Sequence, residues 1–392
     1  METPLMSQNI PMAPVMPSQP PLPPPPPLTT HQVASGIAKW AISCGLLSQL
    51  PPGVDDQFLA QIAPISFSTE AESLLRHKEI QSISYNQITS TISIYTKRKV
   101  IKKDLQVLPS NIWRQGIAYP QGLMDSVGKE ATKPQGATFA LHQIAGGHAT
   151  YACGSSISPG NDASAGTMGA LVRLPDGLLY GLTNNHVSAL CSHVAPNTPI
   201  LAPGVLDVGP NAIAPFTLGF HSRALEMRVG SLGNVDFSNN LDAAVFRIAD
   251  EANVSSMQGG AYDTPLVVLD PVEGMRVQKV GRTTRHTQGQ IVSRELRPLN
   301  VSYHAQSYGF NGMIWFGNVF AIHGDNAEFS KGGDSGSLIV AVDDAGLVLG
   351  AVGLIFAGGS DSSAPGGYRS SMLPLQPILT ALNATLVGGH NV

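Results

Sequence analysis

The chain has 392 residues, of which 43% are hydrophobic and 13% charged, and its formal net charge is −4 at pH 7. This length predicts two domains, at about 100–200 residues per domain. The mild charge argues against a nucleic-acid-binding protein and against a protein of the membrane surface.

The first 30 residues are rich in proline and end in the run PLPPPPPL. Such a composition is typical of a disordered leader with polyproline II character. It has no positively charged start and no continuous apolar run, so we expect no secretory signal. Three cysteines, Cys44, Cys153 and Cys191, leave one unpaired in any disulfide pattern. This number favours a reducing compartment and predicts a cytoplasmic protein.

Residues 31–135 read as a small α/β domain. A helix is expected from near Val33, capped by Thr29 or Thr30 and stopped by the sequence Pro-Pro-Gly at 51–53. The apolar stretch at 33–50 is nearly as long as a membrane span, but it contains Lys39, so we expect a packed helix and no membrane span. A second helix is predicted over Thr69–Ile80.

From Ser82 the apolar residues alternate with polar ones, which predicts strands. The basic run at 97–99 follows, and we interpret it as a lysine-guarded strand edge in preference to a nucleic-acid contact.

Residues 136–392 contain many short apolar runs separated by glycine-rich turns. This pattern predicts a mainly β fold built as a barrel or a sandwich. One helix is expected near the end, over Pro374–Leu386.

The strongest chemical signal is the sequence KGGDSGSLIV at 331–340. Ser335 lies in a tight turn bounded by glycines, which permit backbone geometry that a Cβ would block. The N–H groups of Gly333 and Ser335 can converge in such a turn and form an oxyanion hole.

A serine nucleophile needs a general base and a group that orients the base. His186 follows a predicted strand at 178–182, and Asp242 directly precedes the apolar strand AAVF. Asp236 is the chief rival for the carboxylate, and His193 and His323 are weaker rivals for the base.

The order His186, Asp242, Ser335 is that of the trypsin-type peptidases. TNNHV, LDAAV and GGDSGSLI resemble the histidine, aspartate and serine motifs of that family. The segment at 153–187, VGRTTRHTQGQIV and LIFAGG together resemble the plant Narrow Leaf-type serine proteases and their bacterial relatives. The resemblance covers about residues 80–385. It implies two six-stranded β-barrels with the active site between them, a catalytic triad of these three residues, and oxyanion donors at Gly333 and Ser335.

The same resemblance implies that GAVGLIFAGG at 350–359 lines the specificity cleft and pairs with substrate backbone. The implied substrate-binding residues are Phe329, Phe356, Ala357 and Gly358. No acidic residue lies within 329–333, which favours a small or apolar side chain at the cut site. Arg285 and His286 offer an alternative preference for acidic side chains.

These features predict a serine endopeptidase that hydrolyses protein or peptide substrates without a cofactor. The residue order excludes an α/β-hydrolase. His186, Cys191 and His193 lack a fourth ligand at a recognisable spacing, which argues against a metal. The alternative is a latent or inactive peptidase-fold module that binds peptides or partner proteins. We found no processing signal for a trypsin-type zymogen switch, and we expect control by the N-terminal domain or by homo-oligomer formation.

Overall fold

The computed structural model describes residues 27–128, 141–143, 149–210, 213–231, 237 and 239–392. Most of the predicted leader lies outside this part of the chain, as do Asp236 and the expected domain boundary at 135/136. The helices are α1 (Thr30–Ser43), α2 (Val54–Phe58), α3 (Thr69–Lys78), α4 (Asn185–Ser188) and α5 (Leu375–Leu382).

The N-terminal unit contains three helices and a small group of strands. It contains α1, α2, α3, β1 (Ile80–Asn86), β2 (Thr91–Thr96), β3 (Asn111–Ile112) and β4 (Gln115–Ala118). α1 begins as expected, because Thr29 and Gln32 exchange side-chain-to-backbone hydrogen bonds in a capping box. It ends at Ser43, well before the prolines, since Gly45 turns the chain with φ +67°. The apolar faces of α1 and α3 pack on β1 and β2 in one core.

The C-terminal barrel is closed. It contains β17 (Arg276–Gly281), β18 (Arg285–Glu295), β21 (Phe320–Gly324), β22 (Leu338–Val342), β23 (Val348–Asp361) and β24 (Tyr368–Pro374). The strands pair in the order β17-β22-β23-β24-β21-β18, and β18 pairs again with β17. Apolar side chains from all six strands fill its interior, with Val277, Ile322 and Ile339 fully buried.

The N-terminal barrel is an open, curved sheet. Its strands are β8 (Ser156–Pro159), β9 (Gly166–Thr167), β10 (Ala170–Arg173), β11 (Leu179–Thr183), β12 (Pro199–Ala202), β13 (Phe216–Ala224), β14 (Ala244–Ile248) and β25 (Thr385–Val387). They pair in the order β25-β10-β11-β14-β13-β12-β8-β9. A closed six-stranded barrel beside this half-barrel confirms the expected mainly β, chymotrypsin-like fold. The second of the two expected six-stranded barrels is instead an open eight-stranded sheet in the described part of the chain. No helix in the described ranges is long and apolar enough to cross a membrane.

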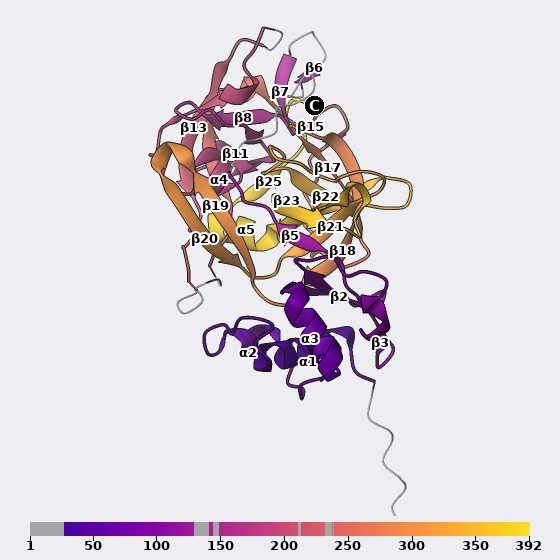
Figure 1. Ribbon diagram of the computed structural model, residues 1–392. Helices are drawn as coiled ribbons and strands as arrows, with labels where there is room; N and C mark the ends of the chain where they lie inside the picture. Colours follow the sequence, from indigo (N-terminus) through magenta and orange to yellow (C-terminus); the bar gives the residue numbers. More distant parts are fainter. Residues whose placement is uncertain (1–26, 129–140, 144–148, 211–212, 232–236, 238) are drawn as a thin grey trace, which may run out of the picture.

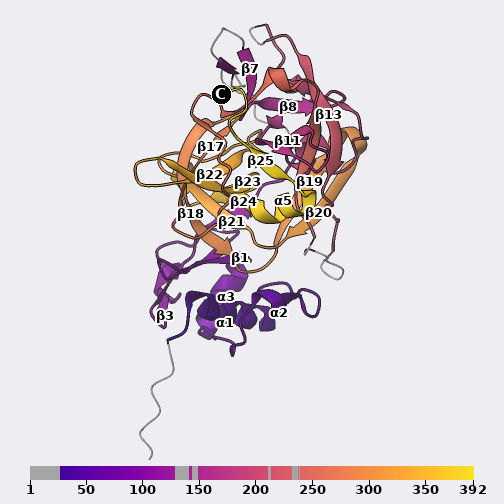
Figure 2. The same ribbon diagram turned by 180° about the vertical axis from the view of Figure 1, so that it is seen from behind.

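Smaller elements complete the chain. They are β5 (Gly122–Met124), β6 (Leu141–Gln143), β7 (Ala149–Cys153), β15 (Val254–Gln258), β16 (Tyr262–Asp263), β19 (Leu299–Ala305) and β20 (Phe310–Phe316). Figures 1 and 2 show the N-terminal unit at one end of the molecule, with the two barrels above it.

The N-terminal unit is joined to the closed barrel by sheet pairing. Ser84 of β1 pairs with Glu295 of β18, so the barrel sheet continues into the unit. A buried polar network reinforces this joint. Arg369 lies 2.8 Å from Glu295 and has its guanidinium 3.9 Å from the ring centre of Tyr95 in β2. A buried charge left without its partner is costly, so the network makes separation of the two parts unfavourable.

Asp361 is the carboxylate at the far side of this network. Its side chain accepts hydrogen bonds from Tyr95, at 2.9 Å, and from His323, at 3.0 Å. Burial raises the pKa of Asp361, but hydrogen bonds from His323 and Ser363 outweigh burial and lower the pKa to about 2. A carboxyl group with a depressed folded-state pKa stabilises the fold above its unfolded value, and that stabilisation is lost as the pH falls toward the folded value.

We expect the wild type to lose unfolding free energy as the pH falls from about 4 to about 2, and Asp361→Asn to lose less over this window. At pH 6 the variant should be the less stable protein, because it lacks the ionised acceptor. Urea unfolding across the pH range measures both effects. Asp56→Asn, at an exposed position of α2, controls for the loss of one negative charge. Parallel pH profiles for the wild type and Asp361→Asn would contradict the expectation.

Candidate active site

The turn at 331–337, which we call the serine turn, belongs to the closed barrel and contacts the N-terminal barrel. Gly333 and Gly336 have φ of +96° and +93°, which favour glycine. A Cβ on Gly336 would lie 2.3 Å from the carbonyl oxygen of Thr167 in the N-terminal barrel. Thr167 in turn donates its N–H to Ser335 O at 2.9 Å. The glycines therefore allow a close backbone contact between the barrels that positions the predicted nucleophile.

Asp334 holds this turn from inside. Its side chain is fully buried and accepts hydrogen bonds from Thr283 N at 2.7 Å, Thr284 Oγ1 at 2.7 Å and Lys331 N at 2.9 Å. Lys279 Nζ lies 3.6 Å away and is also fully buried. Burial lowers the pKa of Lys279, and the Asp334 carboxylate opposes this shift. The carboxylate thus has both hydrogen-bond donors and a cation, all supplied from within the chain.

His186 and Asp242 are brought together by strand register. Thr183 at the end of β11 pairs with Ala244 at the start of β14, so the residues just beyond this pair are neighbours. His186 Nδ1 lies 2.5 Å from Asp242 Oδ2, and His186 N donates to Asp242 Oδ1 at 3.1 Å. Asp242 is fully buried and His186 is 8% exposed. The carboxylate therefore fixes both the backbone and the ring of the histidine.

Tyr303 of β19 is a further residue of the site that the sequence motifs did not reveal. Its hydroxyl donates to Asp242 Oδ2 at 2.9 Å. Burial, and then the charge of Asp242, raise the pKa of Tyr303 well above its usual value, so the hydroxyl stays a neutral donor. The alternating burial of β19 indicates that Tyr303 faces inward, but it does not indicate which carboxylate it meets.

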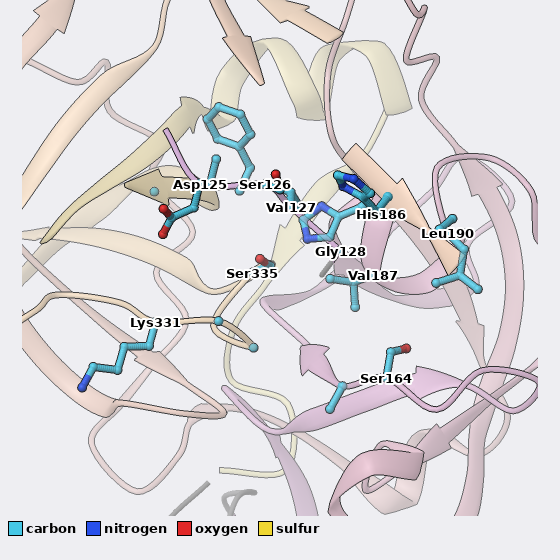
Figure 3. Close-up of a pocket in the computed structure, with 18 of the residues that line it drawn as sticks. Asp125, Ser126, Val127, Gly128, Ser164, His186, Val187, Leu190, Lys331 and Ser335 are labelled. Carbon is cyan, nitrogen blue, oxygen red and sulfur yellow. The ribbon is translucent and has the colours of Figure 1, made fainter. Parts of the chain in front are cut away.

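Ser335 and His186 border one cavity of about 440 Å³. Figure 3 shows the two side chains on its wall. Among the contacts of the described residues there is no hydrogen bond between the Ser335 hydroxyl and His186. Nucleophile and base are often farther apart in an unliganded site than in a complex. His186 is thus hydrogen-bonded to Asp242 and borders the same cavity as Ser335. Among the described residues, no hydrogen bond joins the predicted base to the predicted nucleophile.

Gly333 and Ser335, whose N–H groups are the expected oxyanion donors, both line this cavity. The Gly332 carbonyl accepts from Thr283 Oγ1 at 2.7 Å. In a trans peptide the following N–H points the opposite way, so the N–H of Gly333 is directed away from Thr283. Within the described part of the chain, neither Gly333 N nor Ser335 N has a hydrogen-bond acceptor. Both N–H groups are therefore unpaired in this part of the chain.

Three of the four expected substrate-binding residues, Phe356, Ala357 and Gly358, line the cavity. Phe329 does not, and the prediction for its side chain was wrong. Its ring is fully buried in the core of the closed barrel, and its carbonyl accepts from Thr287 Oγ1 at 2.8 Å. The neighbouring Ser330 lines the cavity instead.

The alternative candidates lie elsewhere. Arg285 and His286 do not line the cavity, and His286 Nε2 lies 2.9 Å from Gln278 Oε1. His193 packs on Phe310, and His323 lies beside Asp361. Among the described residues, no group of three or more histidine, cysteine, aspartate or glutamate side chains could hold a metal ion.

Comparisons with known proteins agree with this architecture. No protein-family model matches the chain. Protein NARROW LEAF 1 of Oryza sativa subsp. japonica is 25% identical over 296 residues, which are 68% of this chain and 48% of that protein. The chain thus spans about half the length of this curated relative.

The similar solved structures are serine proteases. Nocardiopsis protease is 19% identical, with a TM-score of 0.38, over 60% of this chain and 97% of that one. A glutamic acid-specific serine protease is 19% identical, with a TM-score of 0.38, over 60% of this chain and all (100%) of that one. The Rv3671c protease of M. tuberculosis is 18% identical, with a TM-score of 0.27, over 58% of this chain and 77% of that one. The match to protein NARROW LEAF 1 confirms the resemblance to Narrow Leaf-type proteins that the sequence motifs indicated.

Replacing Tyr303 by phenylalanine should lower the free energy of unfolding by about 1.5–3 kcal/mol, because a buried carboxylate loses a hydrogen-bond donor. Chemical denaturation at pH 7 measures the change. Tyr308→Phe is the matched control, since Tyr308 is 39% exposed. Equal stabilities of the two variants would show that the Tyr303–Asp242 hydrogen bond contributes little.

Proposed function

We propose that this chain, which has a chymotrypsin-like peptidase fold, is a serine endopeptidase. Ser335 is the nucleophile, His186 the general base and Asp242 the group that orients the base. The observation that carries the proposal is the buried His186–Asp242 pair, 2.5 Å apart, on the wall of the cavity that Ser335 also lines.

The bond of His186 Nδ1 to Asp242 has a direct chemical consequence. With its proton on Nδ1, the neutral ring presents the lone pair of Nε2 to the cavity. Nε2 takes the proton of Ser335 Oγ as this oxygen attacks the peptide carbonyl carbon. The resulting oxyanion accepts hydrogen bonds from the N–H groups of Gly333 and Ser335.

The intermediate then collapses and the peptide C–N bond breaks. The leaving amine takes its proton from His186, and an ester to Ser335 remains. Water, deprotonated by the same histidine, attacks this ester and releases the acid product. The carboxylate of Asp242 stabilises the imidazolium that forms in each half-reaction, and Tyr303 holds this carboxylate in place.

Protein or peptide substrates are proposed because β23 borders the cavity. An extended peptide can pair with the backbone of Phe356, Ala357 and Gly358 by strand addition. The cavity wall at 330–333 has no carboxylate, and Arg285 and His286 do not line the cavity. We therefore propose small or apolar side chains at the cut position, no cofactor, and, from the cysteine count, a cytoplasmic location.

A second candidate function is a latent module that binds peptides without cutting them. The lack of a hydrogen bond between Ser335 and His186 among the described residues favours this second candidate. The two candidates differ in whether Ser335 reacts.

A fluorophosphonate probe should label the wild type at Ser335, because this reaction needs only the nucleophile, the base and the oxyanion donors. Labelling should be abolished in Ser335→Ala. In His186→Ala it should slow by a factor on the order of 10³ or more, as the serine loses its base. Mass spectrometry of the labelled peptide measures both. Ser337→Ala, two residues away in the same turn, is the control that should still label. A folded wild type that resists the probe would favour the latent module.

If the probe reacts, cleavage of a peptide library should favour alanine, valine or leucine at the cut position over lysine, arginine and glutamate. The reason is that the apolar Phe356 and Ala357 line the cavity and residues 330–333 include no carboxylate that could pair with lysine or arginine. Lys331 also lines the cavity, but its Nζ lies 3.5 Å from Glu328 Oε1, which offsets its attraction for glutamate. Mass-spectrometric profiling of the products tests the preference. Cleavage mainly after glutamate would instead implicate a cationic group that reaches the cavity.

A further inference from the structure

Residues 122–128, which we call the cleft segment, lie along the edge of β23. Met124 pairs antiparallel with Gly359, and Leu123 pairs with Ser360. Asp125 then donates its N–H to the carbonyl of Gly358 at 2.9 Å. The segment therefore extends the barrel sheet along the strand proposed to bind substrate.

The cleft segment runs along β23 in the direction expected for the part of a substrate that precedes the cleaved peptide bond. It runs antiparallel to β23 and advances from Asp361 toward Ile355. Ile355 accepts from Gly336 N at 2.9 Å, so this end of β23 is attached to the serine turn. An extended peptide approaching Ser335 by strand addition would need the same Gly358 carbonyl that Asp125 already occupies.

Beyond Asp125 the segment leaves β23. Val127 donates to Ser302 O at 2.7 Å, and His304 N donates to Val127 O at 2.8 Å, which binds the segment to β19. Gly128 follows with φ +81°, and a Cβ there would lie 2.1 Å from His304 O. The Val127 carbonyl is thus committed to His304, so the peptide bond between Val127 and Gly128 is not offered to the oxyanion donors.

The segment also borders the active-site cavity itself. Asp125, Ser126, Val127 and Gly128 line it together with His186, and Figure 3 shows them along its wall. The side chains of Asp125 and Tyr368 are hydrogen-bonded, and burial raises the pKa of the Asp125 carboxyl group. The space of about 440 Å³ that remains beside Ser335 admits a small molecule.

We propose that the cleft segment is an intramolecular inhibitor of peptide binding. The inference rests on the proposed function. The segment takes the place of the substrate strand on β23 while leaving the nucleophile accessible to small reagents. Because it is part of the same chain, it competes at a high effective concentration. Extended substrates bind only after the contacts at Asp125 and Val127 are released.

The decisive comparison is Asp125→Pro against Asp125→Ala. Both lose the carboxylate, but only proline removes the N–H that bonds to Gly358. Casein hydrolysis should be about tenfold or more faster in Asp125→Pro than in Asp125→Ala, with fluorophosphonate labelling rates within about twofold of each other. Gly128→Ala, which disturbs the attachment to β19, should also accelerate casein hydrolysis. Thermal unfolding establishes that the variants are folded. Equal casein rates in the two Asp125 variants would overturn the proposal.

A binding experiment in the Ser335→Ala background separates this proposal from the proposed function. A fluorescein-labelled decapeptide with the sequence of residues 119–128, YPQGLMDSVG, serves as the probe. It should bind Ser335→Ala/Asp125→Pro and show no saturable binding to Ser335→Ala/Asp125→Ala. This readout needs no catalysis, so it decides the proposal even if the wild type resists the fluorophosphonate. Equal binding to both double variants would overturn it.

Discussion

The geometry of the site depends on the buried charge of Asp334. A carboxylate withdrawn from water is tolerated only with donors and a cation around it. Here the turn after β17 supplies the donors through Thr283 and Thr284, and β17 itself supplies Lys279. Gly281 makes this approach possible, because a Cβ there would lie 2.5 Å from Asp334 Oδ1. Since every partner is internal, the serine turn is held without a new N-terminus, which supports our expectation of activity independent of a zymogen switch.

The second constraint is the approach of the two barrels. A Cβ on Gly169 would lie 2.0 Å from Gly336 O, so the N-terminal barrel touches the serine turn backbone to backbone. The side chains of Asp207 and Arg282 form a buried ion pair that also spans the barrels. Within the N-terminal barrel, the register of β11 and β14 brings His186 and Asp242 to the same edge of the sheet. Fixed backbone positions on both sides are what preorganised catalysis requires.

The positions of His186, Asp242 and Ser335 next to apolar strands could be predicted from sequence because each of these signals is local. Residues that join the site through distant pairing could not. Tyr303 looks like any inward tyrosine of an alternating strand, and its partner is 61 positions away. Phe329 was misplaced because the resemblance supplies a position along the chain, while the side-chain direction depends on how the segment packs into the barrel. The end of α1 was missed because Gly45 ends the helix before the prolines that appeared to stop it.

Strand β23 contacts the N-terminal unit at one end and borders the proposed substrate site a few residues earlier. At its end, Asp361 of β23 accepts from Tyr95 of the N-terminal unit, and a few residues earlier Gly358 accepts from Asp125. The connection from β4 to β5 is short, and Arg369 contacts both Tyr95 and the sulfur of Met124. The N-terminal unit and the cleft segment are therefore linked by direct packing, without a long relay between separate sites. Control of the cleft by the N-terminal unit, which the sequence led us to expect, would have a short physical route through Arg369.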